Sequence, residues 1–404
     1  MRLIACMLMI SIGLIGNPAA AQNKEMKMVD PSEFVIMPWG TTSGDQSVFD
    51  TIRDCGFNTA GFVRVDDLDK VEKAGLKCLV SDPTTHAGDK EALLDQAEID
   101  KRVQALVKRV AGHKAAFGYY LRDEPTARVF PGLGRWAAAV YKADPNALAY
   151  INLFPMGVSI EALGVYSYDH YLDEFVQQIK PKFISYDRYS LMDDGSLAGG
   201  YFLNLERVRA ASHRHNLPFW NIVLSNSHFR YAEPTPAGFR FQLFTTLAYG
   251  ARGISYFTYF TPKTGNYRLG PIDQFGNKTQ TLYMLRDVNL QLQNILPVYI
   301  TLKNVNVFHH PNVPDGSQGI ATSKFTESVE GGGDFVVGEF EGPDGQQFAM
   351  VVNRDLHKST PFQVKFKEDG EIQRVSAYTG QINPWQGEDR WLAAGQGMLL
   401  CLKK

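Results

Sequence analysis

The sequence has few cysteines, and their number and spacing exclude two classes of protein. Cys6 lies in the N-terminal segment, and only Cys55, Cys78 and Cys401 follow it. An odd, sparse set does not form a disulfide framework, and no Cys/His spacing is typical of a metal site. We therefore expect three buried, unpaired thiols and neither a metal nor another cofactor.

Net charge and long apolar runs are also lacking. Lysine and arginine (41) almost balance aspartate and glutamate (43), so nothing indicates a nucleic acid or an anionic membrane surface as partner. After residue 21 no apolar run approaches the roughly 20 residues that a membrane span needs. We expect a soluble protein that recognises its ligand through local contacts.

The N-terminal segment differs in composition from the rest of the chain. Met1 and Arg2 are followed by an apolar stretch, residues 3–16, and then by Ala19-Ala20-Ala21. A basic start, a short apolar core and small residues at a cleavage site are typical of a secretory signal peptide. We predict that residues 1–21 are removed and that the mature protein is exported, to the periplasm or out of the cell.

Short apolar runs alternate with longer helical patterns over the first two thirds of the mature chain. The runs are 34–39, 59–63, 77–82, 117–125, 148–153, 183–187, 219–225 and 253–259. Parallel strands need crossover helices, and eight such units close into a (β/α)8 TIM barrel. No glycine-rich phosphate loop follows the first run, which disfavours a doubly wound sheet. We predict an α/β fold with a catalytic barrel over residues 30–298.

The pattern changes at about residue 301. Short alternating runs follow one another, separated by turns rich in Gly, Asp and Pro, with no long helical pattern between them. This arrangement predicts a small antiparallel β-sandwich over residues 301–404. Pro297 is expected to begin the exit from the preceding helix, residues 281–296. Cys401 should be buried inside the sandwich or against the barrel.

The fourth apolar run ends abruptly in Arg122-Asp123-Glu124-Pro125. It has the composition of a buried parallel strand that carries two carboxyl groups and a guanidinium group to its C-terminal end. Pro125 disfavours helical backbone in the residue before it, so we expect Glu124 to be extended. Side chains of adjacent residues in a strand point to opposite sides, so Asp123 and Glu124 should not pair. The same residues also suit the start of a helix.

Polar and aromatic residues occur where most of the other runs end. In a barrel these ends meet at one mouth, so we predict a shared binding site formed by Trp39, Asp82, Asn152, Asp187, Asn226, His228 and Tyr259. Tyr186 and Tyr189 flank Asp187, and aromatic rings with polar atoms suit the faces and hydroxyl groups of a sugar. Arg122 is expected to pair with Asp123 or Asp187 and to keep that acid ionised.

The chain resembles the retaining glycoside hydrolases of clan A and related bacterial glycosidase-like proteins in three stretches, residues 118–125, 183–189 and 247–259. Residues 349–355 are similar to a strand of the sandwich domain that follows the barrel in those proteins. The resemblance implies hydrolysis of O-glycosidic bonds in a carbohydrate, with Glu124 as general acid/base. Two departures stand out. Asp123 replaces the usual asparagine that bonds the sugar 2-hydroxyl, and residues 219–228 lack the nucleophilic glutamate of the seventh strand.

Glycoside hydrolysis requires a second carboxyl group besides the acid. Asp187 is the first candidate because it ends the sixth run directly, and Glu233, in the loop after the seventh run, is the second. Strands about 4.8 Å apart would place the backbones of Glu124 and Asp187 about 9 to 10 Å apart. This leaves both retention and inversion of configuration open.

Two other functions fit the same residues. A polysaccharide lyase acting on uronic acids would use Arg122 to neutralise the substrate carboxylate, and His228 or a tyrosine as base. A glycan-binding barrel without activity would account for the missing glutamate, because the fold does not determine the function. We therefore predict a secreted glycoside hydrolase, with these two functions as alternatives.

Overall fold

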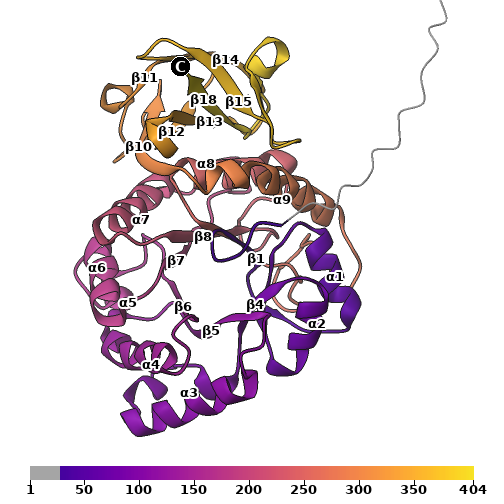
Figure 1. Ribbon diagram of the computed structural model, residues 1–404, viewed down its shortest axis with the longest axis vertical. Helices are drawn as coiled ribbons and strands as arrows, with labels where there is room; N and C mark the ends of the chain where they lie inside the picture. Colours follow the sequence, from indigo (N-terminus) through magenta and orange to yellow (C-terminus); the bar gives the residue numbers. More distant parts are fainter. Residues whose placement is uncertain (1–27) are drawn as a thin grey trace, which may run out of the picture.

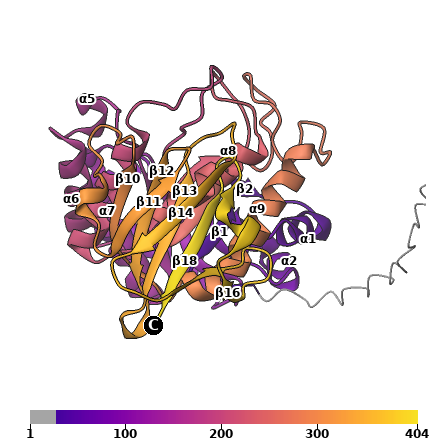
Figure 2. The same ribbon diagram turned by 90° about the horizontal axis from the view of Figure 1, so that it is seen from above.

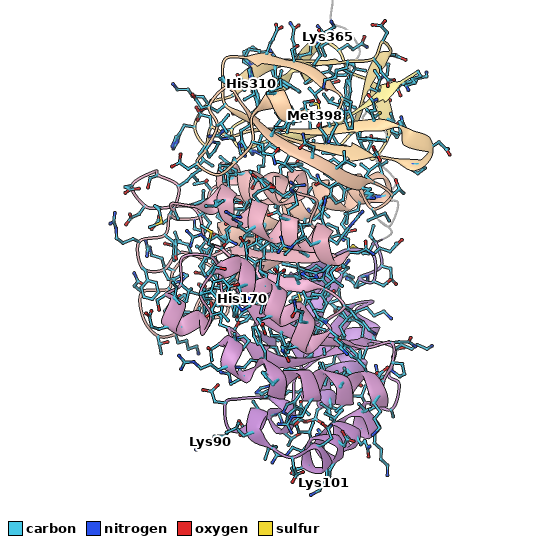
Figure 3. All side chains as sticks on the ribbon, turned by 90° about the vertical axis from the view of Figure 1, so that its left-hand side faces the viewer. Lys90, Lys101, His170, His310, Lys365 and Met398 are labelled. Carbon is cyan, nitrogen blue, oxygen red and sulfur yellow. The ribbon has the colours of Figure 1, made fainter. Side chains whose placement is uncertain are left out.

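A computed structural model describes residues 28–404, so the predicted signal peptide lies outside the described residues. A ring of strands surrounded by helices forms one part, and the C-terminal strands pack on the outside of α8 and α9 (Figure 1). Lys365 lies at the end of the molecule that the sandwich forms, and Lys101 lies at the opposite end, which the barrel forms (Figure 3). Within the described range, no helix has the length and hydropathy needed to cross a bilayer.

Parallel strands form the barrel and follow one another around it in chain order. The first strand is interrupted at Trp39 and Gly40 and so has two parts, β1 and β2. β1 pairs with β9 and β2 pairs with β3, so this strand closes the sheet into a barrel. The predicted barrel is confirmed. Its strands are β1 (Val35–Pro38), β2 (Thr41–Thr42), β3 (Thr59–Val63), β4 (Lys77–Val80), β5 (Ala116–Asp123), β6 (Leu148–Leu153), β7 (Ile184–Asp187), β8 (Phe219–Leu224) and β9 (Gly253–Phe257).

Helices cover the outside of the sheet, and many begin at a capping side chain. Asp95, for example, accepts the backbone N–H of Glu98 at the start of α3, which satisfies a donor that the helix leaves free. The helices are α1 (Gln46–Asp54), α2 (Leu68–Lys73), α3 (Gln96–Val110), α4 (Phe130–Ala143), α5 (Ile160–Leu163), α6 (Tyr168–Ile179), α7 (Tyr201–His215), α8 (Pro236–Ala248) and α9 (Gln280–Tyr299).

Pro297 does not end its helix, because α9 continues to Tyr299. A proline so close to the C-terminal end removes only one helical hydrogen bond. The Tyr299 hydroxyl donates to the carbonyl oxygens of Leu247 (2.8 Å) and Ala251 (3.1 Å), which fixes the last turn against the barrel. Tertiary contacts therefore outweigh the local preference at Pro297.

The C-terminal part consists of two antiparallel sheets, as predicted. The larger sheet contains β10 (Lys303–His310), β12 (Phe335–Glu341), β13 (Gln347–Asn353), β18 (Gly397–Lys403), β15 (Glu371–Val375) and β16 (Ile382–Pro384). The smaller contains β11 (Thr326–Gly331), β14 (Thr360–Phe366) and β17 (Trp391–Leu392). β11, β16 and β17 were not predicted, because β11 is mostly polar and the other two are very short.

The larger sheet packs against α8 (Figure 2), and its side chains belong to two cores. Met350, Leu399 and Cys401 belong to the barrel core, whereas Val351 and Leu400 belong to the core of the sandwich. The described cysteines are buried and unpaired, as predicted. The two parts therefore share apolar surface along one face of the sheet.

Gly338 lies at this interface, and a larger residue there should weaken it. A Cβ atom on Gly338 would overlap the carbonyl group of Ala248 in α8. We expect Gly338→Ala to lower the free energy of unfolding by about 1–3 kcal/mol, as overpacking does elsewhere. Gly199→Ala is the control, because no heavy atom lies within 4 Å of its Cβ position. Urea unfolding measures both variants, and equal stability would contradict the expectation.

Candidate active site

The chain turns at Glu124, directly after β5 ends at Asp123. Glu124 has a φ of 44°, in the left-handed region, while its N–H still donates to the carbonyl oxygen of Asn152 at 2.9 Å. Side chains alternate between the two faces only as far as the strand continues, and the turn ends that alternation, so Asp123 and Glu124 line one cavity. The predictions of an extended Glu124 and of diverging carboxyl groups are therefore wrong. Such backbone conformations cost about 1–3 kcal/mol and concentrate at functional sites.

A cavity of about 200 Å³ opens where the carboxyl ends of the strands meet. Seven residues of the predicted site line it: Trp39, Asp123, Glu124, Asn152, Asp187, Tyr189 and His228. Sequence reasoning missed Ile222, Phe257 and Tyr267. Ile222 and Phe257 lie in apolar strands whose inward side the sequence does not specify, and Tyr267 lies in a loop without periodicity.

The carboxyl groups of Glu124 and Asp187 are within hydrogen-bond reach of each other. Burial, and then the charge of Asp123, raise the pKa of Glu124 to about 7. Burial, and then Glu124, raise the pKa of Asp187 well above its usual range. Asp187 is the more deeply buried, so it keeps its proton to higher pH. A pair of this kind supplies a protonated acid near neutral pH.

Asn152 connects this pair to Asp123. Its Nδ2 donates to Asp187 Oδ1 at 3.0 Å and to Asp123 Oδ1 at 3.1 Å. Its Oδ1 accepts the Ser185 hydroxyl at 3.0 Å, which fixes the orientation of the amide. Burial raises the pKa of Asp123, and the bond from Asn152 opposes that shift. Asn152 therefore holds two of the three carboxyl groups in place.

A buried chain of hydrogen bonds runs from the cavity wall to Asn152. Trp39 Nε1 donates to the Tyr150 hydroxyl at 3.2 Å, and that hydroxyl lies 2.9 Å from Ser185 Oγ. Because Ser185 donates its only proton to Asn152, Tyr150 must donate to Ser185. The direction of each bond is therefore fixed from Trp39 to Asn152.

Aromatic rings and Ile222 form the rest of the wall. Trp39 and Tyr189 both contact Phe257, with ring centroids 5.5 Å and 5.6 Å away. His228 stacks on Tyr267 at 4.6 Å, and burial lowers the His228 pKa, so the ring is neutral at neutral pH. Flat rings with few polar atoms suit the apolar faces of a sugar.

Asn226 supports His228 and does not line the cavity. Its Oδ1 lies 3.2 Å from His228 Nδ1, and its Nδ2 donates to Thr258 Oγ1 at 2.9 Å. The prediction of Asn226 as a residue of the cavity wall is therefore wrong. It orients the imidazole from behind.

Two predicted tyrosines, Tyr186 and Tyr259, do not line the cavity. Ser185 and Asp187 face the barrel interior, so Tyr186 between them packs into the core against the helices, near Phe219. Tyr259 packs edge-on against Phe57 at 5.8 Å. Neither therefore lines the cavity that contains Glu124 and Asp187: alternation along β7 turns Tyr186 into the core, and Tyr259, beyond the end of β9, packs into the core as well.

Two predicted acids instead pair with arginines outside the cavity. Asp82 Oδ2 accepts Arg109 Nη1 of α3 at 2.6 Å, and Asp82 also caps the short helix after β4. Glu233 Oε1 accepts Arg268 Nε at 3.0 Å. Neither lines the cavity, so Asp82 is not part of the predicted shared site and Glu233 is not the second carboxyl group beside Glu124. Arg109 lies in α3 and Arg268 in a loop, and each is distant in sequence from the acid that it holds outside the cavity.

Arg122 pairs with Asp89 at 2.7 Å and not with Asp123 or Asp187. It lowers the pKa of Asp123 only as a minor influence, after burial and the bond from Asn152. The predicted pairing is therefore wrong. Among the described residues that line the cavity there is no arginine or lysine, and no group of acidic, His and Cys side chains in residues 28–404 is arranged to hold a metal ion.

Comparison with known proteins defines the class of fold. No family model and no curated protein matches the sequence. A glycoside hydrolase family 5 structure from Bacteroides vulgatus ATCC 8482 is 12% identical with a TM-score of 0.59, over 91% of this chain and 88% of that one. A beta-galactosidase from Bacillus circulans sp. alkalophilus is 8% identical with a TM-score of 0.60, over 92% and 99%.

A catalytic mutant of a family GH42 beta-galactosidase from G. stearothermophilus has a TM-score of 0.60 at 7% identity, over 94% of this chain and 100% of that one. These neighbours are clan A glycoside hydrolases. The chain therefore has the fold of clan A glycoside hydrolases, a barrel followed by a sandwich, and matches no single family of them.

Proposed function

We propose that the protein is a secreted glycoside hydrolase that cleaves O-glycosidic bonds of an oligo- or polysaccharide, with Glu124 as general acid/base. The observation that carries the proposal is the pair of Glu124 and Asp187 in an aromatic cavity at the mouth of the barrel. The shared fold with clan A glycoside hydrolases supports it. The predicted signal peptide would export the protein to where such glycans occur.

Glu124 suits the acid role because its pKa is about 7. Near neutral pH a large share of the molecules carries the proton that the leaving oxygen needs. When Glu124 gives that proton away, the protonated Asp187 beside it can donate to the new carboxylate. Asp187 is therefore the second carboxyl of the site, acting as the proton partner of Glu124.

A charged nucleophile is the other role for Asp187, and its surroundings favour it less. Retaining glycosidases keep their two carboxyl groups about 5–5.5 Å apart, with the reacting carbon between them. Asp187 is instead within hydrogen-bond reach of Glu124, and burial favours its neutral form. A neutral acid is a poor nucleophile.

A lyase acting on uronic acids is disfavoured, because a substrate carboxylate would meet three carboxyl groups in the cavity. A glycan-binding barrel is the second candidate, since β8 contributes only Ile222 to the cavity wall among the described residues. Aryl glycosides and polysaccharides test these functions. Release of reducing sugar without an unsaturated product supports the hydrolase, and binding without turnover supports the second candidate.

The pH dependence of turnover should follow Glu124. We expect kcat/KM to fall as the pH rises through about 7, where Glu124 loses its proton. Asp187→Ala should move this fall to higher pH, because ionised Glu124 loses the hydrogen bond from Asp187 that lowers its pKa. Tyr186→Phe is the control: its hydroxyl points away from the cavity and has no hydrogen-bond partner.

Azide separates the two roles of Asp187. If azide restores turnover to Asp187→Ala and the product has the opposite anomeric configuration, Asp187 is a nucleophile and the proton-partner role is wrong. We expect no such rescue.

A further inference from the structure

The cavity lacks a protein group placed to attack the sugar. Its described carboxyl groups are Asp123, Glu124 and Asp187. Attack must come from the face opposite the leaving group, which Glu124 protonates. Asp187 is within hydrogen-bond reach of Glu124, so a sugar carbon does not fit between them. Asp187 therefore cannot attack that carbon while Glu124 acts as the acid.

Asp123 is also badly placed for attack. It precedes Glu124 directly, so their Cα atoms are about 3.8 Å apart, and both side chains enter the cavity from the end of β5. They meet the sugar from the same side. Asp123 Oδ1 is moreover held by Asn152 at 3.1 Å.

Asp123 is well placed to accept a hydrogen bond from the substrate. A carboxylate has about four acceptor positions, and Asn152 occupies one of them. The backbone N–H of Glu124 is in reach of another. Asp123 lines the cavity beside Glu124, so its free acceptor positions lie close to the bond whose leaving oxygen Glu124 protonates. The substituent nearest that bond on a sugar ring is the one on C2. Asp123 therefore selects a C2 substituent that donates an N–H or O–H.

We propose that the substrate is a 2-acetamido-2-deoxy sugar, that its own acetamido carbonyl oxygen is the nucleophile, and that Asp123 binds its N–H. This inference rests on the proposed glycosidase function. It supplies from the substrate the group that the cavity does not contain. Neighbouring-group attack of this kind is an accepted alternative to an enzyme nucleophile.

The steps balance without another reactant. Glu124 gives its proton to the leaving oxygen as the bond from C1 to that oxygen breaks, and the acetamido oxygen bonds to C1 from the opposite face. The cyclic cation carries its charge partly on the N–H that Asp123 holds. Water then adds to C1 and gives a proton to Glu124, and the amide re-forms. One water is consumed, and two inversions give net retention.

The rest of the cavity fits this substrate. Tyr189, Phe257 and Tyr267 supply aromatic surface for the acetamido methyl group. The volume of about 200 Å³ is below the ~300–1,000 Å³ of sites for drug-sized ligands, as expected for one terminal sugar. The attack also requires the acetamido and leaving groups to be trans, hence a β-glycoside in the gluco and galacto series.

Matched 4-nitrophenyl α- and β-glycosides of the gluco and galacto series, each with a 2-acetamido or a 2-hydroxyl group, test the proposal with the full-length enzyme. We expect at least a ~10²-fold preference in kcat/KM for a 2-acetamido β-glycoside, comparable with the loss of one transition-state contact. Equal or better hydrolysis of a 2-hydroxy sugar, or hydrolysis confined to α-glycosides, would overturn this inference and leave the glycosidase function standing.

A thiazoline, in which sulfur replaces the attacking oxygen, probes Asp123 directly. It should bind the wild type, and Asp123→Ala should weaken binding and lower kcat by ~10²–10³-fold, with an unchanged melting temperature. Fluorination of the N-acyl group should slow the wild type progressively. An unaffected Asp123→Ala, an inverted product, or a 2-fluoro sugar bound covalently to an aspartate would overturn the inference. No hydrolysis of any glycoside and no thiazoline binding would overturn the glycosidase function as well.

Discussion

Glu124→Gln should lower kcat by ~10²-fold or more on glycosides with poor leaving groups. The amide keeps the shape of the side chain and a hydrogen bond to Asp187, but it has no acidic proton to give. Substrate binding should change little, because the cavity walls are untouched. Stopped assays of sugar release with purified protein measure the loss, and wild-type activity on a natural glycan would refute the role of Glu124.

The same variant should be more stable than the wild type in alkaline solution. The pKa of Glu124 rises from 4.5 to about 7 in the folded protein, so the fold disfavours the ionised carboxylate. Wild-type stability therefore decreases as the pH rises from about 4.5 through 7, and glutamine does not titrate. Melting temperatures at about pH 4 and pH 8 should differ from the wild type only at the higher pH. A lower value at both would mean that the substitution damages the fold.

Removal of the sandwich, by truncation after Tyr299, should give insoluble or unfolded protein. Nearly every residue of α8 is buried, including Phe241 and Phe244, because the barrel covers one side and the sheet the other. A helix that is apolar all round must stay covered. Loss of β12, β13 and β18 would expose that surface and would remove Met350 and Leu399 from the barrel core.

Expression yield and size-exclusion chromatography test the truncation. Gly338→Ala offers a milder comparison, since it should weaken the same interface without removing it. A soluble, fully active barrel that ends at Tyr299 would contradict the role of the sandwich as a packed support.

The strands were predictable because eight apolar runs of strand length alternate with amphipathic segments. Which side of a strand faces the cavity was less predictable. β7 is buried on both faces, so its apolar pattern does not reveal that Asp187 points inward and Tyr186 outward. The alternation rule also ends with the strand, which is why the turn at Glu124 was missed.

Partners far apart in the chain were not predictable either. Asp82 pairs with Arg109 and Glu233 with Arg268, and no local sequence pattern predicts a pairing between residues so far apart in the chain. Each ion pair holds its carboxyl group outside the cavity. The cavity therefore contains fewer carboxyl groups than the strand ends suggested.

The dependence of rate on the leaving group tests the role of Glu124 most directly. The measurement compares kcat/KM of the wild type and of Glu124→Gln on aryl glycosides whose phenols differ in acidity. We predict a small dependence for the wild type and a steep one for the variant, with a large loss for weakly acidic phenols and almost none for a 2,4-dinitrophenyl glycoside, which needs no acid. Equal losses on all of them would contradict Glu124 as the proton donor.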